Sequence, residues 1–243
     1  MDDPAVFNSV LDKFNFSEIN VMGWLFRFLS SSIGQKFVSG LTGLFLISFL
    51  LVHLAGNLQL LNSDVEAAKT SFNAYSHFMS TNPVIRILEI GLVLGFALHI
   101  FYGIKLYLAN KAARPVAYAT RDANANSKWT SRSMFLSGSI ILVFLILHLL
   151  NFFVKARFGG EEDMYTLVVE AFKLPYYSIF YVVAMILLGL HLNHGFQSAF
   201  QTFGLLGKKY ASVIKGAGVA VAVIIPLLYA IIPLYFLLGI GGK

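Results

Sequence analysis

The stretch FVSGLTGLFLISFLLVHLAGNLQLL, residues 37–61, contains no Asp, Glu, Lys or Arg. At about 1.5 Å per residue, a helix of this length crosses a hydrocarbon core roughly 30 Å thick. Its only ionisable side chain is His53, near the end of the run. An imidazole is costly in hydrocarbon unless it has a partner or lines a site. The stretch therefore predicts a membrane span that carries a functional histidine.

Composition extends this interpretation to the whole chain. Hydrophobic residues make up 57% and charged residues 12%, and the mean hydropathy is +0.73, far outside the range of a soluble domain. We expect an all-α membrane protein, a five-transmembrane-helix bundle forming one domain over residues 1–243. The predicted spans are Phe37–Leu61, Val84–Leu108, Met134–Phe153, Tyr176–Phe203 and Val213–Leu238.

The segment before the first span, residues 1–33, is expected to be cytoplasmic or interfacial. Residues 1–30 lack a charged start followed by an apolar core, so they do not resemble a signal peptide, and the first span would direct insertion. Val21–Ser32 mixes Trp24 and Arg27 with other aromatic residues, and lies either on the membrane surface or against a partner. In the last span, Pro226 and Pro233 predict a kink.

Four histidines occupy matched positions in the first four spans. His53, His99 and His148 lie 16 or 17 residues after Lys36, Pro83 and Arg132, and His191 lies at a similar distance, 18 residues, after Lys173. A single histidine would favour a hydrogen bond between helices or a proton relay in a transporter. Four on four helices, without acid clusters beside them, favour ligation of cofactors.

The distribution of Lys and Arg sets the orientation. Twelve lie on the N-terminal side of the five spans and six on the other, where they mix with acids. This bias predicts a multi-pass protein of the bacterial cytoplasmic (inner) membrane with its N-terminus in the cytoplasm. The net charge of +6 is explained by orientation, so we expect no nucleic-acid partner.

Direction of travel then pairs the histidines. The first and third spans run outward, so His53 and His148 approach the outer face, whereas His99 and His191 approach the cytoplasm. The two levels are roughly 15–20 Å apart. The pattern predicts two bis-histidine haems, an outer one on His53 and His148 and an inner one on His99 and His191. Cysteine is absent, so the haems would be non-covalent b haems and the chain holds no iron–sulfur cluster.

Four segments resemble a known family: GQKFVSGLTGLFLISFLLVHLAGN, FALHIFYGIKLYL, LVFLILHLLNFFVK and GLHLNHGFQSAFQTFG. They are similar to the single-chain, five-helix, two-haem cytochrome b anchor of succinate:quinone oxidoreductases and fumarate reductases. The resemblance spans nearly the whole chain and is most specific at the spaced histidines and at the H-x-x-x-G of His191–Gly195. In that family the first and third histidine-bearing helices hold the outer haem, and the second and fourth hold the inner haem. This is the pairing predicted here from depth.

The resemblance implies a respiratory complex. A cytoplasmic flavoprotein would oxidise succinate, an iron–sulfur subunit would lie beside it, and this chain would anchor both in membrane lipid. Electrons would pass through two b haems to a membrane quinone, either menaquinone or ubiquinone. Alternatives are a di-haem anchor of a hydrogenase or formate dehydrogenase, an ascorbate-dependent di-haem cytochrome, or a haem-free proton-coupled transporter.

Other polar residues are secondary candidates. His194 lies one turn from His191 and could replace it as ligand or contact a propionate. Glu89, about 9 Å into its span, either exchanges protons with quinone or pairs with Arg86. Near the outer face Glu66, Tyr75 and His77 are quinone candidates, on a helix that Ser63 and Glu66 would open as a capping box.

Two further groups would surround the haems. Propionate partners would be Lys36, Ser39, Lys105 and Gln201 for the inner haem, and Arg86, Asn57 and Asn151 for the outer haem. Glycines on the histidine-bearing spans would touch either porphyrin or a neighbouring helix: Gly40, Gly43, Gly56, Gly91, Gly95, Gly103, Gly189 and Gly195.

Overall fold

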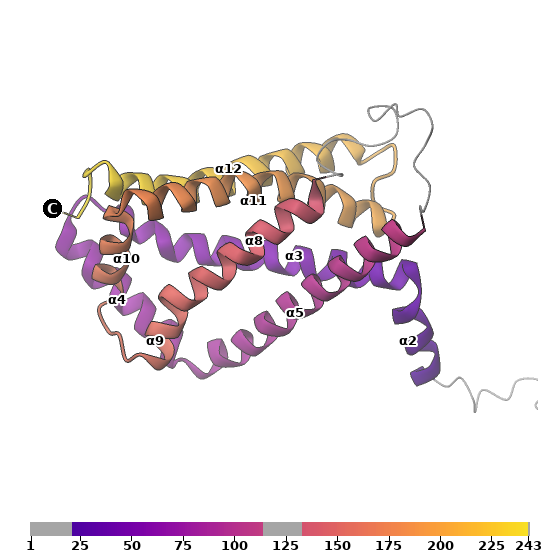
Figure 1. Cartoon of the computed structure of the whole chain (residues 1–243), viewed down its shortest axis with the longest axis horizontal. Helices are drawn as coiled ribbons and strands as arrows, with labels where there is room; N and C mark the ends of the chain where they lie inside the picture. Colours follow the sequence, from indigo (N-terminus) through magenta and orange to yellow (C-terminus); the bar gives the residue numbers. More distant parts are fainter. Residues whose placement is uncertain (1–20, 114–132, 243) are drawn as a thin grey trace, which may run out of the picture.

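The computed structural model describes residues 21–113 and 133–242, and every regular element in these ranges is a helix. Five helical segments are long and apolar enough to cross a membrane. They confirm the predicted all-α, five-helix membrane protein, and their bounds differ from the predicted spans by a few residues. Figure 1 shows the order of the helices: α2 (Val21–Ser30), α3 (Ser32–Asn57), η2 (Leu58–Leu61), α4 (Val65–Thr81), α5 (Pro83–Ala112), α8 (Met134–His148), η3 (Leu149–Phe153), α9 (Val154–Phe158), α10 (Met164–Lys173), α11 (Pro175–Thr202) and α12 (Ala211–Leu237).

Local chemistry places the helix ends. Ser31 opens α3 by accepting a hydrogen bond from the backbone of Gly34. Asn82 caps α5 in the same way, and Pro83 follows it at the first helical position, where a missing N–H costs nothing. After α11 the chain turns at Gly204, whose φ of 73° is accessible to glycine at little cost.

The helix α4 begins one residue later than the sequence suggested. The cap is Asp64, whose side chain accepts from the backbone of Ala67, and not Ser63. Asn62 in turn accepts from the backbone of Asp64. A carboxylate is at least as good a cap as a hydroxyl, so Asp64 takes the position and Glu66 lies in the first turn without closing a capping box.

Helices α11 and α12 form the most extensive pair, and α11 also packs against α3 and α8. Pro226 deprives the carbonyl of Ala222 of its usual donor within α12. At that point α11 comes close, and a Cβ added to Gly189 would lie 2.8 Å from the oxygen of Ala222. Gly189 is therefore a helix-packing glycine. The helix α12 is continuous through both of its prolines.

The buried core lies toward one end of the bundle, where α4, α10 and η2 meet the ends of α11 and α12 (Figure 1). We call this the C-terminal end, and the end with α2 the N-terminal end. An ion pair joins α4 to the start of α10, with 2.7 Å between Lys69 Nζ and Asp163 Oδ2. Asn73 donates to Asp163 and accepts from the backbone of Tyr165. These bonds fix α4 over α10 as a polar cap.

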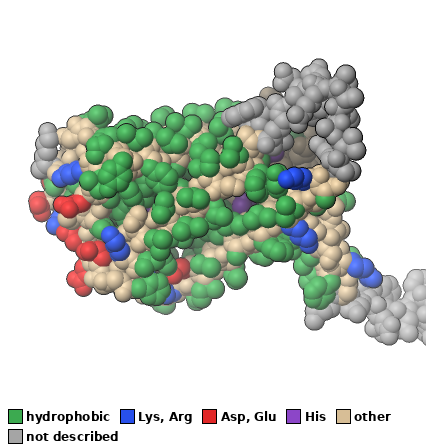
Figure 2. Space-filling view, in the orientation of Figure 1, with side chains coloured by type: hydrophobic (Ala, Val, Ile, Leu, Met, Phe, Trp, Pro, Cys, Tyr) green, Lys and Arg blue, Asp and Glu red, His purple; other side chains and the backbone are tan. Residues whose placement is uncertain are grey.

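The surface has the charge pattern of a membrane protein. Figure 2 shows hydrophobic side chains over the middle of the bundle, with Asp and Glu gathered at the C-terminal end. Among the described residues on this face, Lys and Arg but no Asp or Glu are visible at the N-terminal end. Large apolar side chains are exposed along α5, for example Ile87 at 70% and Ile90 at 64%. Such a surface is soluble only in lipid, so the chain is a multi-pass membrane protein.

The short helix α2 projects from the N-terminal end (Figure 1). A stack of Trp24 on Phe28 continues through Phe37 to Phe203 and joins α2 to the ends of α3 and α11. Trp24 and Phe26 remain largely exposed. Residues 1–20 of the expected interfacial segment lie outside the described residues, as do Arg114, Arg121, Lys128 and Arg132 of the basic loop.

Candidate functional site: two histidine pairs

His53 of α3 and His148 of α8 face each other toward the C-terminal end. Their ring centres are 5.8 Å apart and their planes are nearly perpendicular, at 85°. With metal–nitrogen bonds of about 2.0–2.1 Å, two imidazoles on opposite sides of one ion have ring centres about 6 Å apart. The separation therefore fits two axial ligands of a single metal ion.

His99 of α5 and His191 of α11 form a second pair. Their ring centres are 6.3 Å apart, with 71° between the planes. This separation again fits two ligands of one ion. The structure thus pairs the same histidines that were predicted to lie at the same depth in the membrane. Within the described residues no cluster of three or more His, Cys, Asp or Glu side chains could hold a metal ion, and the four histidines are grouped as two pairs.

Neighbouring helices fix the rings of the second pair. His99 Nδ1 lies 3.2 Å from the backbone oxygen of Ser39, one turn before Gly43 on α3. A carbonyl only accepts, so Nδ1 must carry the proton and Nε2 keeps its lone pair. A Cβ on Gly43 would lie 3.2 Å from the His99 ring, so any larger residue there would push the ring by a few tenths of an ångström.

His191 is held on α8 in the same manner. Its Nδ1 is 3.5 Å from the hydroxyl of Ser137, which donates its own proton to the carbonyl of Met134. The hydroxyl oxygen is therefore placed to accept from Nδ1. Gly138 lies against the ring, since an added Cβ would be 3.4 Å from its Cε1. Both rings of this pair thus present Nε2, the nitrogen that ligation requires, while Nδ1 is held by the protein.

The first pair has a more aromatic environment. His148 Nδ1 is 3.1 Å from the hydroxyl of Tyr181 on α11. His53 stacks on Phe49 and lies 6.0 Å, between ring centres, from Tyr229. Asn57, one turn further along α3, donates to the backbone oxygen of His53 at 2.8 Å and approaches both ring nitrogens at 3.4–3.5 Å.

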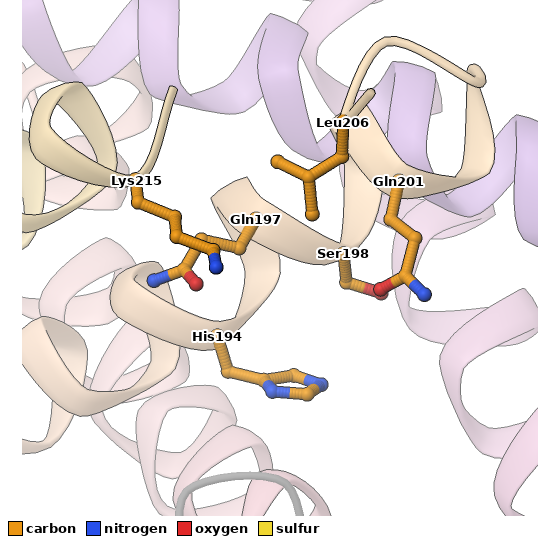
Figure 3. A pocket seen from close by; sticks show the side chains of 6 residues that line it. All are labelled: His194, Gln197, Ser198, Gln201, Leu206 and Lys215. Carbon is orange, nitrogen blue, oxygen red and sulfur yellow. The ribbon is translucent and has the colours of Figure 1, made fainter. Parts of the chain in front are cut away.

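His194 lies in a separate polar pocket of about 220 Å³ at the N-terminal end. Figure 3 shows its ring among side chains of α11 and of the following turn and helix: Gln197, Ser198, Gln201, Leu206 and Lys215. The side chain opposite His99 is His191 and not His194. Lys215 and the amides give this pocket the chemistry of an anion site, in keeping with the prediction that Gln201 and His194 contact a propionate.

Glu89 forms an ion pair with Arg86 on the same face of α5. The carboxylate is about one-quarter exposed and the guanidinium about one-third. Pairing with Arg86 is one of the two roles that the sequence predicted for Glu89. A carboxylate paired in this way can still exchange protons, so its role with quinone stays a prediction.

The three quinone candidates on α4 have different surroundings. Tyr75 packs on Gly56, where an added Cβ would lie 2.2 Å from its ring, and burial raises the pKa of its hydroxyl. Because Gly56 lies one turn beyond His53, Tyr75 is close to the first histidine pair. Glu66 and His77 are exposed, and nothing in their contacts brings them to either pair.

Most of the predicted propionate partners already have protein partners. Asn57 donates to the backbone of His53, Asn151 donates to the hydroxyl of Tyr177, and Arg86 pairs with Glu89, whereas Ser39 contacts His99 through its backbone oxygen and not its hydroxyl. Lys105 lies over the ring of Phe101 and Lys36 is exposed. The glycines likewise divide: Gly40 and Gly95 pack on helices, whereas added Cβ atoms on Gly91, Gly103 and Gly195 would meet nothing within 4 Å.

Several residues of the site had no clear signal in the sequence. Ser137, Gly138, Thr42 and the pair Tyr177 and Tyr181 all lie around the histidines. The tyrosines are four residues apart and so share a face of α11, but rotation of that helix about its axis decides what they face. His148 is also followed directly by a π-helical turn, Leu149–Phe153, a feature frequent at functional sites.

Comparison with family models, with curated proteins and with solved structures finds no match to this chain.

Proposed function

We propose that this chain is a di-haem cytochrome b that conducts electrons across a membrane. The observation that carries the proposal is the arrangement of four histidines as two facing pairs, with ring centres 5.8 and 6.3 Å apart. His53 and His148 would hold one b haem, and His99 and His191 the other. When bound, the two haems would supply one-electron transfer along the bundle.

The chemistry of the donors supports haem over a proton relay. In a relay each imidazole passes protons through both nitrogens, so both need exchanging partners. Here Nδ1 of His99 bonds a backbone carbonyl, which holds the proton on that nitrogen. The other nitrogen, Nε2, then keeps its lone pair. A residue that orients a ligand through its second nitrogen is the usual support of a metal-bound histidine.

We further propose that the chain is the membrane anchor subunit of a succinate:quinone oxidoreductase, as the four resembling segments imply. Its partners would be a flavoprotein subunit, an iron–sulfur subunit, quinone and lipid. The basic N-terminal end would face the bacterial cytoplasm and meet the iron–sulfur subunit, and quinone would bind near His53 and His148. Tyr75, packed beside that pair, is the best-placed of the α4 candidates.

A reduced-minus-oxidised absorption spectrum of the protein purified from its native membrane tests the class of function. We expect the α-band of b-type haem, two larger subunits that co-purify with the chain, and succinate-dependent quinone reduction. A spectrum without haem bands would favour the transporter. Haem bands without the flavoprotein and without succinate activity would identify an anchor for another dehydrogenase.

A further inference from the structure

His148 is linked to a chain of hydrogen-bonding side chains that leads toward the C-terminal end. Its Nδ1 is 3.1 Å from the hydroxyl of Tyr181, which is 3.0 Å from the hydroxyl of Tyr177. Asn151, in the π-helical turn that follows His148, donates to Tyr177 at 3.2 Å. Two neighbouring tyrosines of α11 thus connect His148 at the end of α8 with Asn151 in the turn that follows it.

The surroundings of Tyr181 make these bonds hard to replace with water. The side chain is only 6% exposed. Its ring contacts Phe144, Phe152 and Phe172, with ring centres 4.8, 6.4 and 5.0 Å away. A hydroxyl in such an apolar setting needs a protein partner. Tyr181 has two, the imidazole of His148 and the hydroxyl of Tyr177.

Ligation by His148 would fix the direction of the whole chain. If Nε2 binds iron, Nδ1 carries the proton and donates it to the oxygen of Tyr181. Tyr181 can then donate to Tyr177, which also accepts from Asn151. Because Tyr181 donates its own proton to Tyr177, its oxygen is a better acceptor than that of an isolated phenol, and Asn151 holds Tyr177 in place. A better acceptor at Nδ1 makes the imidazole a stronger electron donor through Nε2.

The other three histidines have different partners at this position. His99 approaches a backbone carbonyl, His191 approaches a serine hydroxyl at 3.5 Å, and His53 lies beside the amide of Asn57. The two predicted haem sites are therefore chemically unequal. Electron donation by the axial ligand stabilises the oxidised iron, so unequal ligand support gives unequal potentials.

We propose that Tyr181 is a positioning residue for His148, and that the chain Tyr181–Tyr177–Asn151 sets the reduction potential of the iron held by His53 and His148. This inference rests on the proposed function, because it requires that the pair bind haem. It assigns to these side chains a graded effect: loss of Tyr181 removes the acceptor itself, whereas loss of Tyr177 only weakens it.

The test is a potentiometric titration of the purified complex, with low-spin ferric EPR signals recorded on the same samples. Tyr181→Phe should shift the midpoint potential of one b haem to a more positive value and change its EPR signal, leaving the other haem unmoved. Tyr177→Phe should shift the same haem in the same direction by less. Tyr229→Phe is the matched control, because Tyr229 lies beside His53 but donates to the backbone oxygen of Leu50; it should leave both potentials unchanged.

The results separate this inference from the proposed function. Wild-type protein without two b haems would refute the function. Two b haems whose potentials do not move in Tyr181→Phe would overturn the inference alone, as would a shift of both haems together. If Tyr181→Phe loses the haem altogether, Tyr177→Phe decides, since it leaves the bond to His148 in place; unshifted potentials in that variant would again overturn the inference.

Discussion

At the scale of single residues, the ability of each histidine to bind a metal ion depends on which of its ring nitrogens carries the proton. The backbone carbonyl of Ser39 is placed to accept the proton of His99 Nδ1. The hydroxyl of Ser137 donates its own proton to Met134, so its oxygen is placed to accept the proton of His191 Nδ1. Both arrangements leave Nε2 as the available ligand. The same residue type in a random transmembrane packing site would have no reason to be oriented in this way twice.

The choice between His191 and His194 gives a direct prediction. His191→Ala should remove the haem of the His99 pair and leave the other, because only His191 faces His99. His194→Ala should keep both haems, since its ring lies in the polar pocket of Figure 3. Haem content of the two purified variants, by pyridine haemochrome, is the measurement. Retention by His191→Ala with loss in His194→Ala would exchange the two assignments.

Glu89 gives a second prediction at this scale. Glu89→Gln keeps the shape and a hydrogen bond to Arg86 but cannot ionise. We expect both b haems to remain while quinone turnover falls at least tenfold, because the variant cannot exchange protons at this position. Quinone turnover and haem content should be measured on one preparation, with Arg86→Gln as the companion variant. Normal turnover in Glu89→Gln would leave the residue as a structural partner of Arg86 and direct the search to Glu66, Tyr75 and His77.

At the scale of elements, the cap formed by α4 and α10 depends on Asp163. The hydrogen bond from Lys69, helped by Asn73 and Thr166, holds the pKa of this carboxyl well below its usual value of 3.8. Because the folded pKa is lowered, this stabilisation is present at pH values above about 4 and is lost as the pH falls through the lower, folded value. Asp163 also caps α10 by accepting from the backbone of Thr166.

Two substitutions separate the roles of Asp163. Asp163→Ala removes cap and charge, and loss of a cap alone costs about 1 kcal/mol. Asp163→Asn can still cap the helix but loses the ion pair, so it should be the milder variant. Thermal unfolding in detergent at pH 7 and pH 3 is the measurement, and the difference between wild type and Asp163→Asn should shrink at pH 3. A difference that does not depend on pH would contradict the role of the charge.

The elements also show what sequence could and could not predict. Span positions follow from the length of apolar runs, and the histidine pairs follow from depth along those runs, so both were accessible. The partners of the histidines were not, because rotation of each helix about its axis is set by packing. Tyr181 and Ser137 belong to this class. The cap of α4 was predicted at Ser63 but lies at Asp64, since several adjacent polar residues compete for one position.

At the scale of the whole molecule, charge distribution predicts the orientation of the bundle. The exposed Lys111 lies in the last turn of α5 and the exposed Lys208 lies in the turn between α11 and α12, whereas the exposed Glu161 lies between α9 and α10, at the other end of the bundle. The native chain has no cysteine, so single cysteines can be introduced at these positions. An impermeant thiol reagent should label Glu161→Cys in intact cells, and Lys111→Cys or Lys208→Cys only after permeabilisation. The reverse pattern would invert the topology and place the iron–sulfur partner on the other side.

The two histidine pairs have different environments, so the two ends of the bundle are not equivalent for electron transfer. His53 and His148 lie near the buried aromatic core at the C-terminal end, whereas His99 and His191 lie nearer the basic N-terminal end. In the proposed function, two haems in different environments would pass electrons between a partner docked at one end of the bundle and quinone at the other. The proposed function requires first of all that each pair independently hold one haem.

The stoichiometry of haem tests that requirement most directly. Pyridine haemochrome content per chain should be two for the wild type, one for His148→Ala, one for His191→Ala and none for the double variant. Each single variant should show the difference spectrum of the one haem that it retains. The spectra of His148→Ala and His191→Ala should therefore add up to the wild-type spectrum. One haem or none in the folded wild-type protein, or loss of both haems from each single variant that still folds, would contradict two independent bis-histidine sites.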